Sequence, residues 1–334
     1  MTAYLAEAPA SPRVLDALLA EADAELDAGN TGHALAAVER ARILTEGPSF
    51  GDADRAAVFF RLGRCRLAVG SVANAASLLT LALDLCDRSV LAPDALRVEI
   101  LDWRARCYQR QRDWEAARAD VERAVELAQA LGDPLRTARV LFQASIVAER
   151  ERQWLVARYY AEQARDLLTE TGDLAALGKV LNNLGGIHFL LGDGVRATEC
   201  LEDALAIARE GESRLDIGYA LSSLAQLRLR TGDAAGAIVD AHDALDQLDG
   251  RVDHANEVAS ANLVLARAFA ALARVPEADA AFRRAEDALR DFGSDSHLAA
   301  AWLVGGDVAR AAGDETRAAD LYRRAAEALQ DVHF

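Results

Sequence analysis

Apolar residues follow a helical period along the whole chain. In one segment, for example, Val180, Leu181, Leu184, Ile187 and Leu191 recur at spacings of three and four residues. This spacing places the side chains on one face of an α-helix, where they can pack against a neighbouring helix. No stretch shows the strict alternation of apolar and polar residues that is typical of a half-buried strand. The pattern therefore predicts an all-helical protein.

Small residues recur about every forty residues and set the register of this pattern. A first column is alanine in every copy, a second alanine follows it seven residues later, and a third small residue precedes it by twelve. Members of the third column are 41, 42, 40, 40, 40, 41 and 40 residues apart, which predicts eight units and leaves no room for a separate catalytic domain. The columns are Ala34, Ala75, Ala117, Ala157, Ala197, Ala237, Ala278 and Ala318; Ala41, Ala82, Ala124, Ala164, Ala204, Ala244, Ala285 and Ala325; and Ala22, Gly63, Ala105, Ser145, Gly185, Ala225, Ala266 and Gly306.

Each unit is predicted to be a helical hairpin. Small residues seven apart lie on one face of a helix, where another helix can approach closely, and the third column then belongs to the preceding helix. Between them stands a Gly-Asp or Gly-Asn pair, as at Gly29-Asn30 and Gly192-Asp193, which supplies a left-handed helix end and then a cap. The predicted organisation is a tail at 1–12 and a single solenoid at 13–334. Its units are approximately 13–54, 55–96, 97–136, 137–176, 177–216, 217–257, 258–297 and 298–334.

The fifth and the last units carry the most specific motif. The fifth unit reads Leu181, Leu184-Gly185, His188, Gly192-Asp193, Ala197, Leu201 and Ala204, and the last reads Trp302, Gly305-Gly306, Gly313-Asp314, Ala318, Tyr322 and Ala325. This pattern resembles the tetratricopeptide repeats, whose signature is a Trp, a Leu-Gly, a Tyr, an Ala, an aromatic residue and a Pro over about 34 residues. The period here is longer by about six residues, the Pro is missing and the Trp is usually lost, as in the long-repeat members of bacterial regulatory proteins. The resemblance implies an all-α, right-handed superhelical solenoid of about eight hairpins.

Composition and charge exclude several classes of function. Hydrophobic residues make up 52% of the chain and aromatic residues only 6%, which suits close helix packing rather than a sandwich or barrel. A net charge of −16 argues against direct binding of nucleic acid by this chain, because neutralising phosphates needs a basic surface. No apolar run of about 18 residues and no signal peptide in Met1–Pro12 is seen, so we expect a cytoplasmic protein without membrane insertion.

Candidate catalytic and metal-binding patterns are explained better by the repeat itself. The four cysteines lack Cys-x-x-Cys spacing, and Cys65 and Cys107 occupy equivalent positions, which favours buried apolar thiols over a metal or redox site. His188 takes the Tyr position of the family, and no histidine pair has the spacing of a zinc site on a helix. Glycine clusters such as Gly192-Asp193-Gly194 fit hairpin turns rather than phosphate loops. We therefore predict no catalytic residue, no metal and no cofactor.

The family resemblance implies that the first helices of successive hairpins line a concave groove. Trp114, Trp154 and Trp302 fall at turn or packing positions, whereas Trp103 lies on the face that points to the groove. Within the set expected on this face, seven residues are basic and one is acidic, and the amides can bond peptide carbonyls and amides alike. This chemistry suits an extended or helical peptide of acidic character. The predicted groove residues are Arg64, Trp103, Arg106, Gln109, Arg139, Gln143, Lys179, Asn182, Asn183, Tyr219, Ser222 and Gln226, flanked by Arg61, Asp102, Arg110 and Arg267.

A structural alternative stays open for each of these residues. The arginines can pair with acids on neighbouring helices, such as Glu99 or Glu149, and so only solvate the inner wall. The amides of the middle units favour ligand binding over the structural alternative. They line up across adjacent repeats instead of forming hydrogen bonds within one helix. These are Gln143, Asn182, Asn183, Ser222 and Gln226.

Two functional hypotheses follow. The first is a non-enzymatic scaffold that holds a segment of a partner protein in the groove. The second rests on the resemblance alone: Leu-Asn-Asn-Leu-Gly at Leu181–Gly185 is similar to the repeat domains of helix-turn-helix transcriptional regulators, some of which bind signalling peptides. Only about a dozen residues precede the first repeat, so this alternative requires a domain of a larger regulator or a regulator that works through a partner.

The last unit gives an expectation about assembly. It ends near Phe334 without an evident polar capping helix, and solenoids commonly need such a cap for solubility. Val332 and Phe334 would then fold back or be covered by another chain. A homodimer through a terminal repeat is therefore an expectation.

Overall fold

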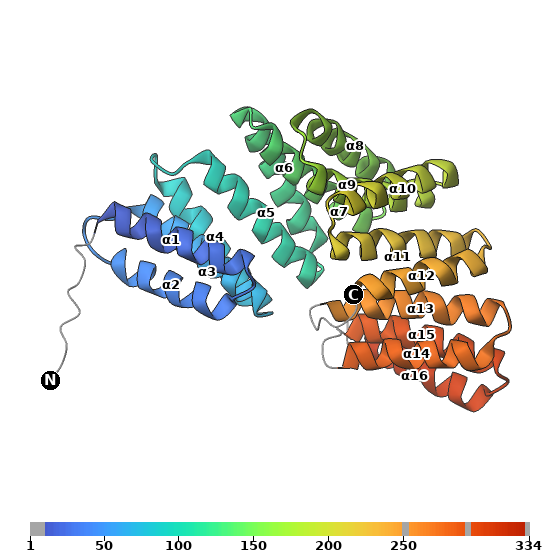
Figure 1. Ribbon diagram of the computed structural model, residues 1–334. Coiled ribbons are helices and arrows are strands. Elements are labelled where there is room, and N and C mark those ends of the chain that lie inside the picture. Colours follow the sequence, from blue (N-terminus) through green and yellow to red (C-terminus); the bar gives the residue numbers. More distant parts are fainter. Residues whose placement is uncertain (1–10, 249–253, 291–294, 331–334) are drawn as a thin grey trace. The chain divides into compact units, whose positions relative to one another are not determined.

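The computed structural model describes residues 11–248, 254–290 and 295–330, and in these residues the chain forms sixteen α-helices and no strand (Figure 1). The helices pair along the sequence into hairpins, because each odd-numbered helix packs most extensively on the helix that follows it. The prediction of an all-helical repeat of about eight hairpins is confirmed.

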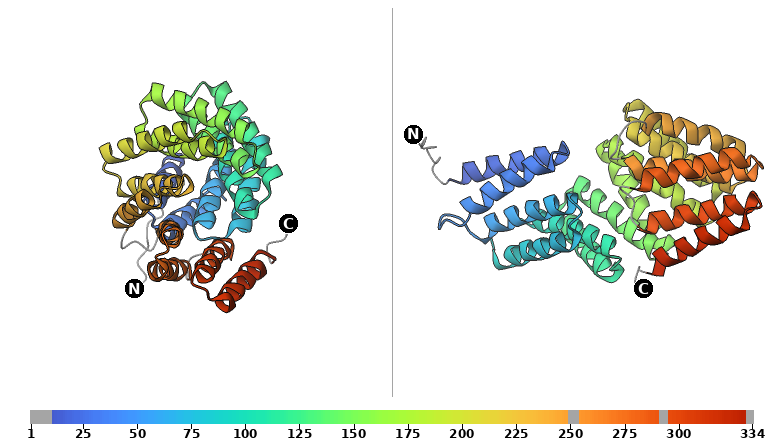
Figure 2. Two further views of the ribbon diagram at one scale, coloured as in Figure 1. Left: turned by 90° about the vertical axis from the view of Figure 1, so that its right-hand side faces the viewer. Right: turned by 90° about the horizontal axis from the view of Figure 1, so that it is seen from below.

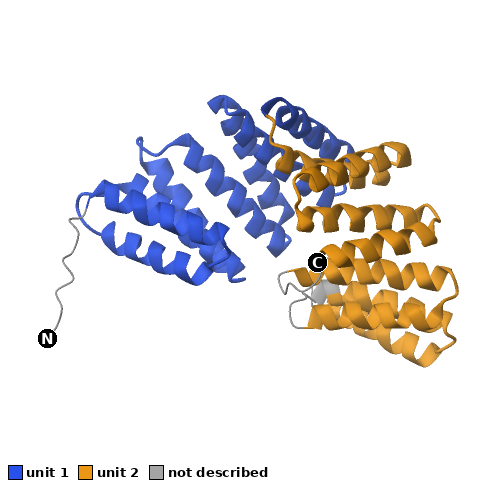
Figure 3. Ribbon diagram, viewed as in Figure 1, with its two compact units in different colours: residues 1–171 blue, residues 172–334 orange. Residues whose placement is uncertain are grey.

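Two compact units divide the hairpins equally (Figure 3). Unit 1 spans Met1–Thr171 and unit 2 spans Gly172–Phe334. Unit 1 contains α1 (Pro12–Asp27), α2 (Thr31–Leu44), α3 (Asp52–Ala68), α4 (Val72–Arg88), α5 (Asp94–Gln111), α6 (Trp114–Leu131), α7 (Pro134–Arg150) and α8 (Trp154–Thr171). Unit 2 contains α9 (Leu174–Leu190), α10 (Gly194–Glu210), α11 (Arg214–Arg230), α12 (Ala234–Leu248), α13 (Ala255–Ala271), α14 (Val275–Arg290), α15 (Asp295–Ala311) and α16 (Glu315–Gln330).

Within each unit the odd-numbered helices form an inner row. In unit 1, α1 contacts α3, α3 contacts α5, and α5 contacts α7; in unit 2, α9, α11, α13 and α15 contact one another in the same order. No pair of even-numbered helices makes comparable contacts among the described residues. Because the odd-numbered helices approach one another more closely, each unit curves towards its own inner row (Figure 2).

The three small-residue columns form the core between the helices, as their spacing predicts. Every alanine of these columns is at most 2% exposed, and the glycines and the serine are buried as well. At Gly185, for example, an added Cβ would lie 2.6 Å from Cγ of Leu201 and 3.2 Å from the carbonyl oxygen of Ala197. The columns therefore mark the places where two helices approach too closely for larger side chains.

All eight hairpin turns place one residue in the left-handed region, seven residues after the third column. Glycine supplies it in five turns, with φ between +77° and +91°, whereas Arg112, Arg152 and Ala273 supply it in the other three. The following aspartate caps the next helix in the predicted way; for example, Asp193 accepts a hydrogen bond from the backbone N–H of Arg196 at 3.1 Å. The prediction of a cap at Asn30 is wrong, because its side chain makes no capping hydrogen bond.

The last described helix, α16, has a charged outer face. Arg323 pairs with Asp320 and with Glu327 along the exposed side, while Ala318, Leu321 and Ala325 face the core. The expectation that the last unit lacks a polar capping helix is therefore wrong, and Val332 and Phe334 lie outside the described residues. No described helix combines the length and the apolarity needed to cross a membrane.

Candidate functional site

Two of the predicted arginines of unit 1, Arg61 and Arg64, lie on the inner row and are held by an aspartate of the neighbouring inner helix, α1. Asp23 on α1 accepts hydrogen bonds from Arg61 at 2.7 and 2.9 Å and from Arg64 at 2.6 Å, both on α3. Arg64 and Arg61 retain only 14% and 18% exposure of their side chains. Their charges are therefore largely balanced inside the unit, as the structural alternative expects, although the acid is Asp23 and not Glu99 or Glu149.

Trp103 on α5 is in cation–π contact with two guanidinium groups. The guanidinium carbon of Arg64 lies 4.9 Å from the ring centroid, and that of Arg106 lies 5.0 Å from it. These contacts connect α3 with α5 along the inner row. The ring is therefore held by two cation–π contacts and remains partly exposed.

Arg106 in turn pairs with Asp102, one helical turn earlier on α5, at 2.9 Å. Burial raises the pKa of the Asp102 carboxyl, although Arg106 lowers it in part. Its Oδ1 and the buried Nε2 of Gln109 have no hydrogen-bond partner among the described residues. Arg139 on α7 is exposed, whereas Gln143 is buried at 5% exposure and does not present a free amide.

Unit 2 carries the predicted amides on α9 and α11. Tyr219 donates a hydrogen bond from its hydroxyl to Glu257 on α13 at 2.6 Å, and Gln226 donates to Oγ of Ser260 on α13 at 3.2 Å. Burial and the bond to Glu257 raise the pKa of Tyr219. These two contacts fix the inner face of α11 against α13.

Two polar atoms on this face are buried without a hydrogen-bond partner in the described part of the chain. They are Oδ1 of Asn182 on α9 and Oγ of Ser222 on α11. Asn183 is half-buried beside Asn182, and Lys179 is exposed one turn earlier on the same helix. Lys179 on α9 and Arg267 on α13 are exposed cations that have no carboxylate within ion-pair distance in the described residues. This inner face therefore offers unpaired donors and acceptors, in contrast to the ion-paired arginines of unit 1.

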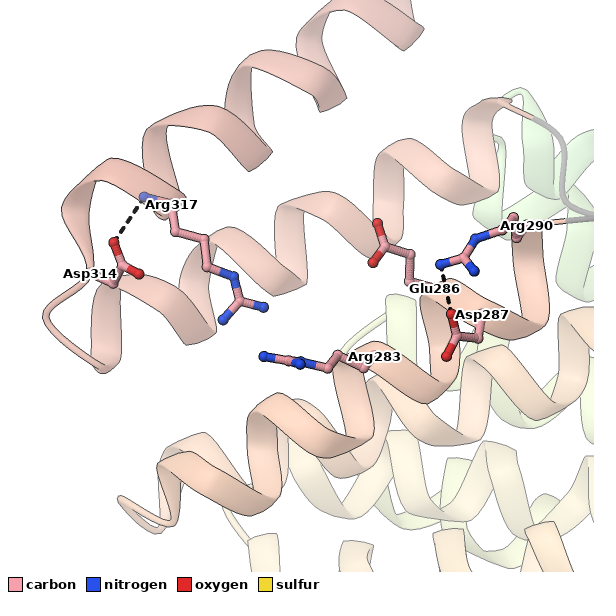
Figure 4. Close-up of a pocket in the computed structure, with 6 residues that line it drawn as sticks. All are labelled: Arg283, Glu286, Asp287, Arg290, Asp314 and Arg317. Atoms are coloured by element: carbon pink, nitrogen blue, oxygen red, sulfur yellow. Dashed lines mark hydrogen bonds and ion pairs between the residues drawn. The ribbon is translucent and has the colours of Figure 1, made fainter.

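A polar depression of about 610 Å³ lies between α14 and α16, away from the predicted groove residues (Figure 4). Its charges are paired locally: Arg290 pairs with Asp287 at 2.7 Å, and Asp279 binds both Arg283 at 3.0 Å and Arg317 at 2.7 Å. Paired, exposed side chains of both signs do not define a preference for one ligand charge. The lining residues are Arg283, Glu286, Asp287, Arg290, Asp314 and Arg317.

The cysteines have the environment of core residues. Cys65, Cys86 and Cys107 are buried, and burial raises the pKa of each thiol, to about 11 for Cys107. A thiol with a raised pKa stays protonated at neutral pH and is a poor nucleophile or metal ligand. Within the described ranges, no group of three or more His, Cys, Asp and Glu side chains is placed to hold a metal ion.

Comparisons with known proteins agree with this architecture. Residues 96–170 match the sequence profile of the tetratricopeptide repeat family, and no curated protein matches the sequence. The apo form of the quorum sensor NprR from B. thuringiensis is similar in structure, with a TM-score of 0.73 and 11% identity over 94% of this chain and 87% of that one.

Two further solved structures are similar over most of their length. The Rap conjugation gene regulator of the plasmid pLS20, in complex with the Phr* peptide, has a TM-score of 0.66 and 12% identity over 96% of each chain. Aspartyl phosphate phosphatase F from Bacillus subtilis has a TM-score of 0.66 and 16% identity over 84% of this chain and 70% of that one. Together with the eight-unit register, these comparisons show that the described residues have the fold of a tetratricopeptide repeat solenoid, and that residues 96–170 match this family in sequence.

Proposed function

We propose that this protein is a non-enzymatic scaffold that binds an extended peptide segment along α9, α11 and α13 of unit 2. The observation that carries the proposal is the pair Asn182 and Ser222. They stand at equivalent positions, forty residues apart and three residues before Gly185 and Ala225 of the third column. Both bury a polar atom that has no hydrogen-bond partner among the described residues. An unpaired buried polar atom is unfavourable by roughly 1–3 kcal/mol, so a ligand that pairs with two of them gains affinity.

The spacing of the helices fits an extended backbone. Packed helix axes lie about 8–10 Å apart, and an extended chain rises about 3.3 Å per residue. Asn182 and Ser222 would therefore contact ligand backbone groups about three residues apart. Gln226, which is bonded to Ser260, and Tyr219, which is bonded to Glu257, would flank these contacts from α11.

Charge supports a ligand with acidic groups. Lys179 and Arg267 leave two cations near the amides without a carboxylate at ion-pair distance in the described residues, whereas the arginines Arg61, Arg64 and Arg106 of unit 1 already pair with Asp23 and Asp102. An acidic side chain on the ligand would pair with either free cation.

The comparisons give independent support for a peptide ligand. The structurally similar pLS20 regulator is described in complex with the Phr* peptide. NprR, the similar quorum sensor, favours the second candidate, in which the chain is the sensing part of a transcriptional regulator. Both candidate functions place the peptide on the inner row. They differ in its consequence, because a scaffold only holds its partner, whereas a sensing domain changes the activity of a transcriptional regulator.

A selection from a random 12-residue peptide library on the wild-type chain tests the proposal. We expect Asn182→Ala/Ser222→Ala to bind the selected peptide at least about tenfold more weakly, since two buried polar groups lose their partner. Asn74→Ala, at an exposed amide on α4, is the matched control and retains wild-type affinity. If the double variant is folded and binds the peptide with unchanged affinity, the proposed contacts of Asn182 and Ser222 are contradicted.

The non-enzymatic part of the proposal has its own test. One similar structure is an aspartyl phosphate phosphatase, so acyl phosphate hydrolysis is the reaction to examine. We expect acetyl phosphate to hydrolyse at the same rate with and without the protein. A protein-dependent increase would assign an enzymatic role.

A further inference from the structure

Two neighbouring hairpin turns of unit 1 carry a cluster of free arginines. Arg112 ends the α5–α6 hairpin turn, and Arg150 and Arg152 flank the turn between α7 and α8. All three side chains are exposed, and none makes a hydrogen bond, an ion pair or a ring contact with any residue that the structure describes. We call Arg112, Arg150 and Arg152 the turn-edge arginines.

The two turns lie side by side because an ion pair joins them. Arg118, in the second turn of α6, donates a hydrogen bond at 2.6 Å to Oε1 of Glu151, the residue that directly precedes Arg152. Asp113, the residue after Arg112, is occupied as well, since it accepts the backbone N–H of Ala116 at 3.1 Å. Asp113 and Glu151, which adjoin the turn-edge arginines in sequence, are therefore already engaged, and Glu149, which precedes Arg150, has an interaction of its own.

Other arginines of the same helices behave differently. Arg104 on α5 pairs with Asp120 at 2.7 Å, and Arg123 on α6 lies 3.6 Å from Asp87. In a chain of net charge −16, a carboxylate partner is easy to find for most cations. Three unpaired arginines in adjacent turns thus form a local positive surface on an acidic protein.

Backbone conformation adds a second, independent observation. Arg112 and Arg152 both have φ of +61°, at the position where five of the eight turns have glycine. A non-glycine residue in this region is strained, and such strain is retained mainly where the side chain is useful. Glycine would fit both turns better. Ala273 has the same conformation without a charged side chain, so the two free guanidinium groups are what distinguish these turns.

We propose that the turn-edge arginines form a docking surface for an acidic segment of a partner protein. Guanidinium groups bind carboxylates through two parallel hydrogen bonds, which suits Asp and Glu side chains. Three cations match a short acidic segment, whereas the long-range repulsion from a chain of −16 disfavours a polyanion such as duplex DNA. This surface lies on the turns and is separate from the amides of unit 2, so it goes beyond the proposed function.

Binding of a fluorescein-labelled peptide with three consecutive glutamates, measured at low salt, tests this surface. We expect Arg112→Gly/Arg152→Gly to bind the peptide roughly tenfold more weakly than the wild type, and to unfold at a higher temperature because glycine relieves the strain. The same pair of substitutions thus separates a binding role from a structural one. A variant that gains stability and keeps its affinity would overturn the proposal, as would a wild-type chain that does not bind the peptide at low salt.

Two controls complete the experiment. Ala273→Gly makes the same backbone change in a turn of unit 2 without removing a charge, and Arg40→Gln/Arg323→Gln removes two exposed charges elsewhere; both retain wild-type affinity. Asn182→Ala/Ser222→Ala also retains it, so failure of the proposed function is recognisable separately. Tighter binding of a 10-base-pair DNA duplex, or self-association of the wild type that the double variant lacks, would overturn the assignment to an acidic protein segment.

Discussion

At the residue scale, the hairpin turns require one left-handed residue, and its identity varies along the chain. Gly192 has φ of +84° and Ala273 has φ of +57° at equivalent positions. We expect Gly192→Ala to lower the free energy of unfolding by about 1–2 kcal/mol and Ala273→Gly to raise it by about 0.5–1 kcal/mol, because an L side chain is strained there. Thermal unfolding followed by circular dichroism measures both. Shifts of the same sign in both variants would contradict this explanation.

Asp102 makes the folding stability of the chain depend on pH, and the direction of this dependence can be predicted. Burial raises the pKa of its carboxyl, while Arg106 and Arg139 lower it and Glu99 raises it further. A carboxyl with a raised pKa in the folded chain binds protons preferentially there, so its contribution to stability grows as the pH falls from 7 towards the unfolded value of about 4. Asp102→Asn removes this titration. We expect the melting temperature of the wild type relative to Asp102→Asn to be higher at pH 5 than at pH 7.

Asp203→Asn, at an exposed carboxylate on α10, is the control for this comparison. It removes a charge without removing a buried titrating group. A difference between wild type and Asp102→Asn that is the same at both pH values would show that the buried carboxyl does not titrate in this range.

The register placed Arg64, Trp103 and Arg106 on one face, and the structure brings them together on the inner row. Asp23 was missed, although it stands one residue after Ala22, in the register position that Arg64 and Arg106 hold after Gly63 and Ala105. Equivalence in the repeat shows which residues share a face. It does not show which of them pair, because pairing depends on side-chain reach between neighbouring helices. Gln143 is the converse case, since it follows the register but is buried.

At the scale of elements, two adjacent glycines of α9 affect stability for different reasons. Gly185 lies in a close contact with α10, whereas Gly186 only lowers the helix propensity of α9. An added Cβ at Gly185 would meet Leu201 at 2.6 Å, while one at Gly186 would meet nothing within 4 Å. We expect Gly185→Ala to destabilise by about 1–3 kcal/mol through overpacking against α10. Gly186→Ala is the matched control and should stabilise by about 0.5–1 kcal/mol, because alanine is the better helix former. Chemical denaturation of both variants checks the pair, and equal effects would show that the third column is not a close contact.

Helices and turns were predictable at this scale because small residues and glycine report on local geometry. The columns, the left-handed glycines and the cap at Asp193 all followed from spacing. The polar outer face of α16 was missed because its charges pair with one another along the helix, as Arg323 does with Asp320 and Glu327. In the sequence, a run of mixed charges has the pattern of an ordinary exposed helix face. The pattern does not show whether another hairpin covers that face.

At the scale of the whole molecule, the repeat predicts a single solenoid from residue 13 to residue 334, while contacts divide the chain into Met1–Thr171 and Gly172–Phe334. In solenoids, stability is a sum of repeats and their nearest-neighbour interfaces. Each half holds four complete hairpins with buried alanine columns of its own. Both halves should therefore have enough local contacts to fold without the other.

We expect the fragments 1–171 and 172–334, expressed separately, to be helical and to unfold cooperatively, because each retains four complete hairpins. Circular dichroism and calorimetry measure both properties. The fragment 172–334 should also bind the library-selected peptide within about threefold of the full chain, because Asn182 and Ser222 both lie in it. A folded 172–334 fragment without affinity would contradict the placement of the peptide site on unit 2. An unfolded fragment would instead show that the four hairpins of that unit are not stable by themselves.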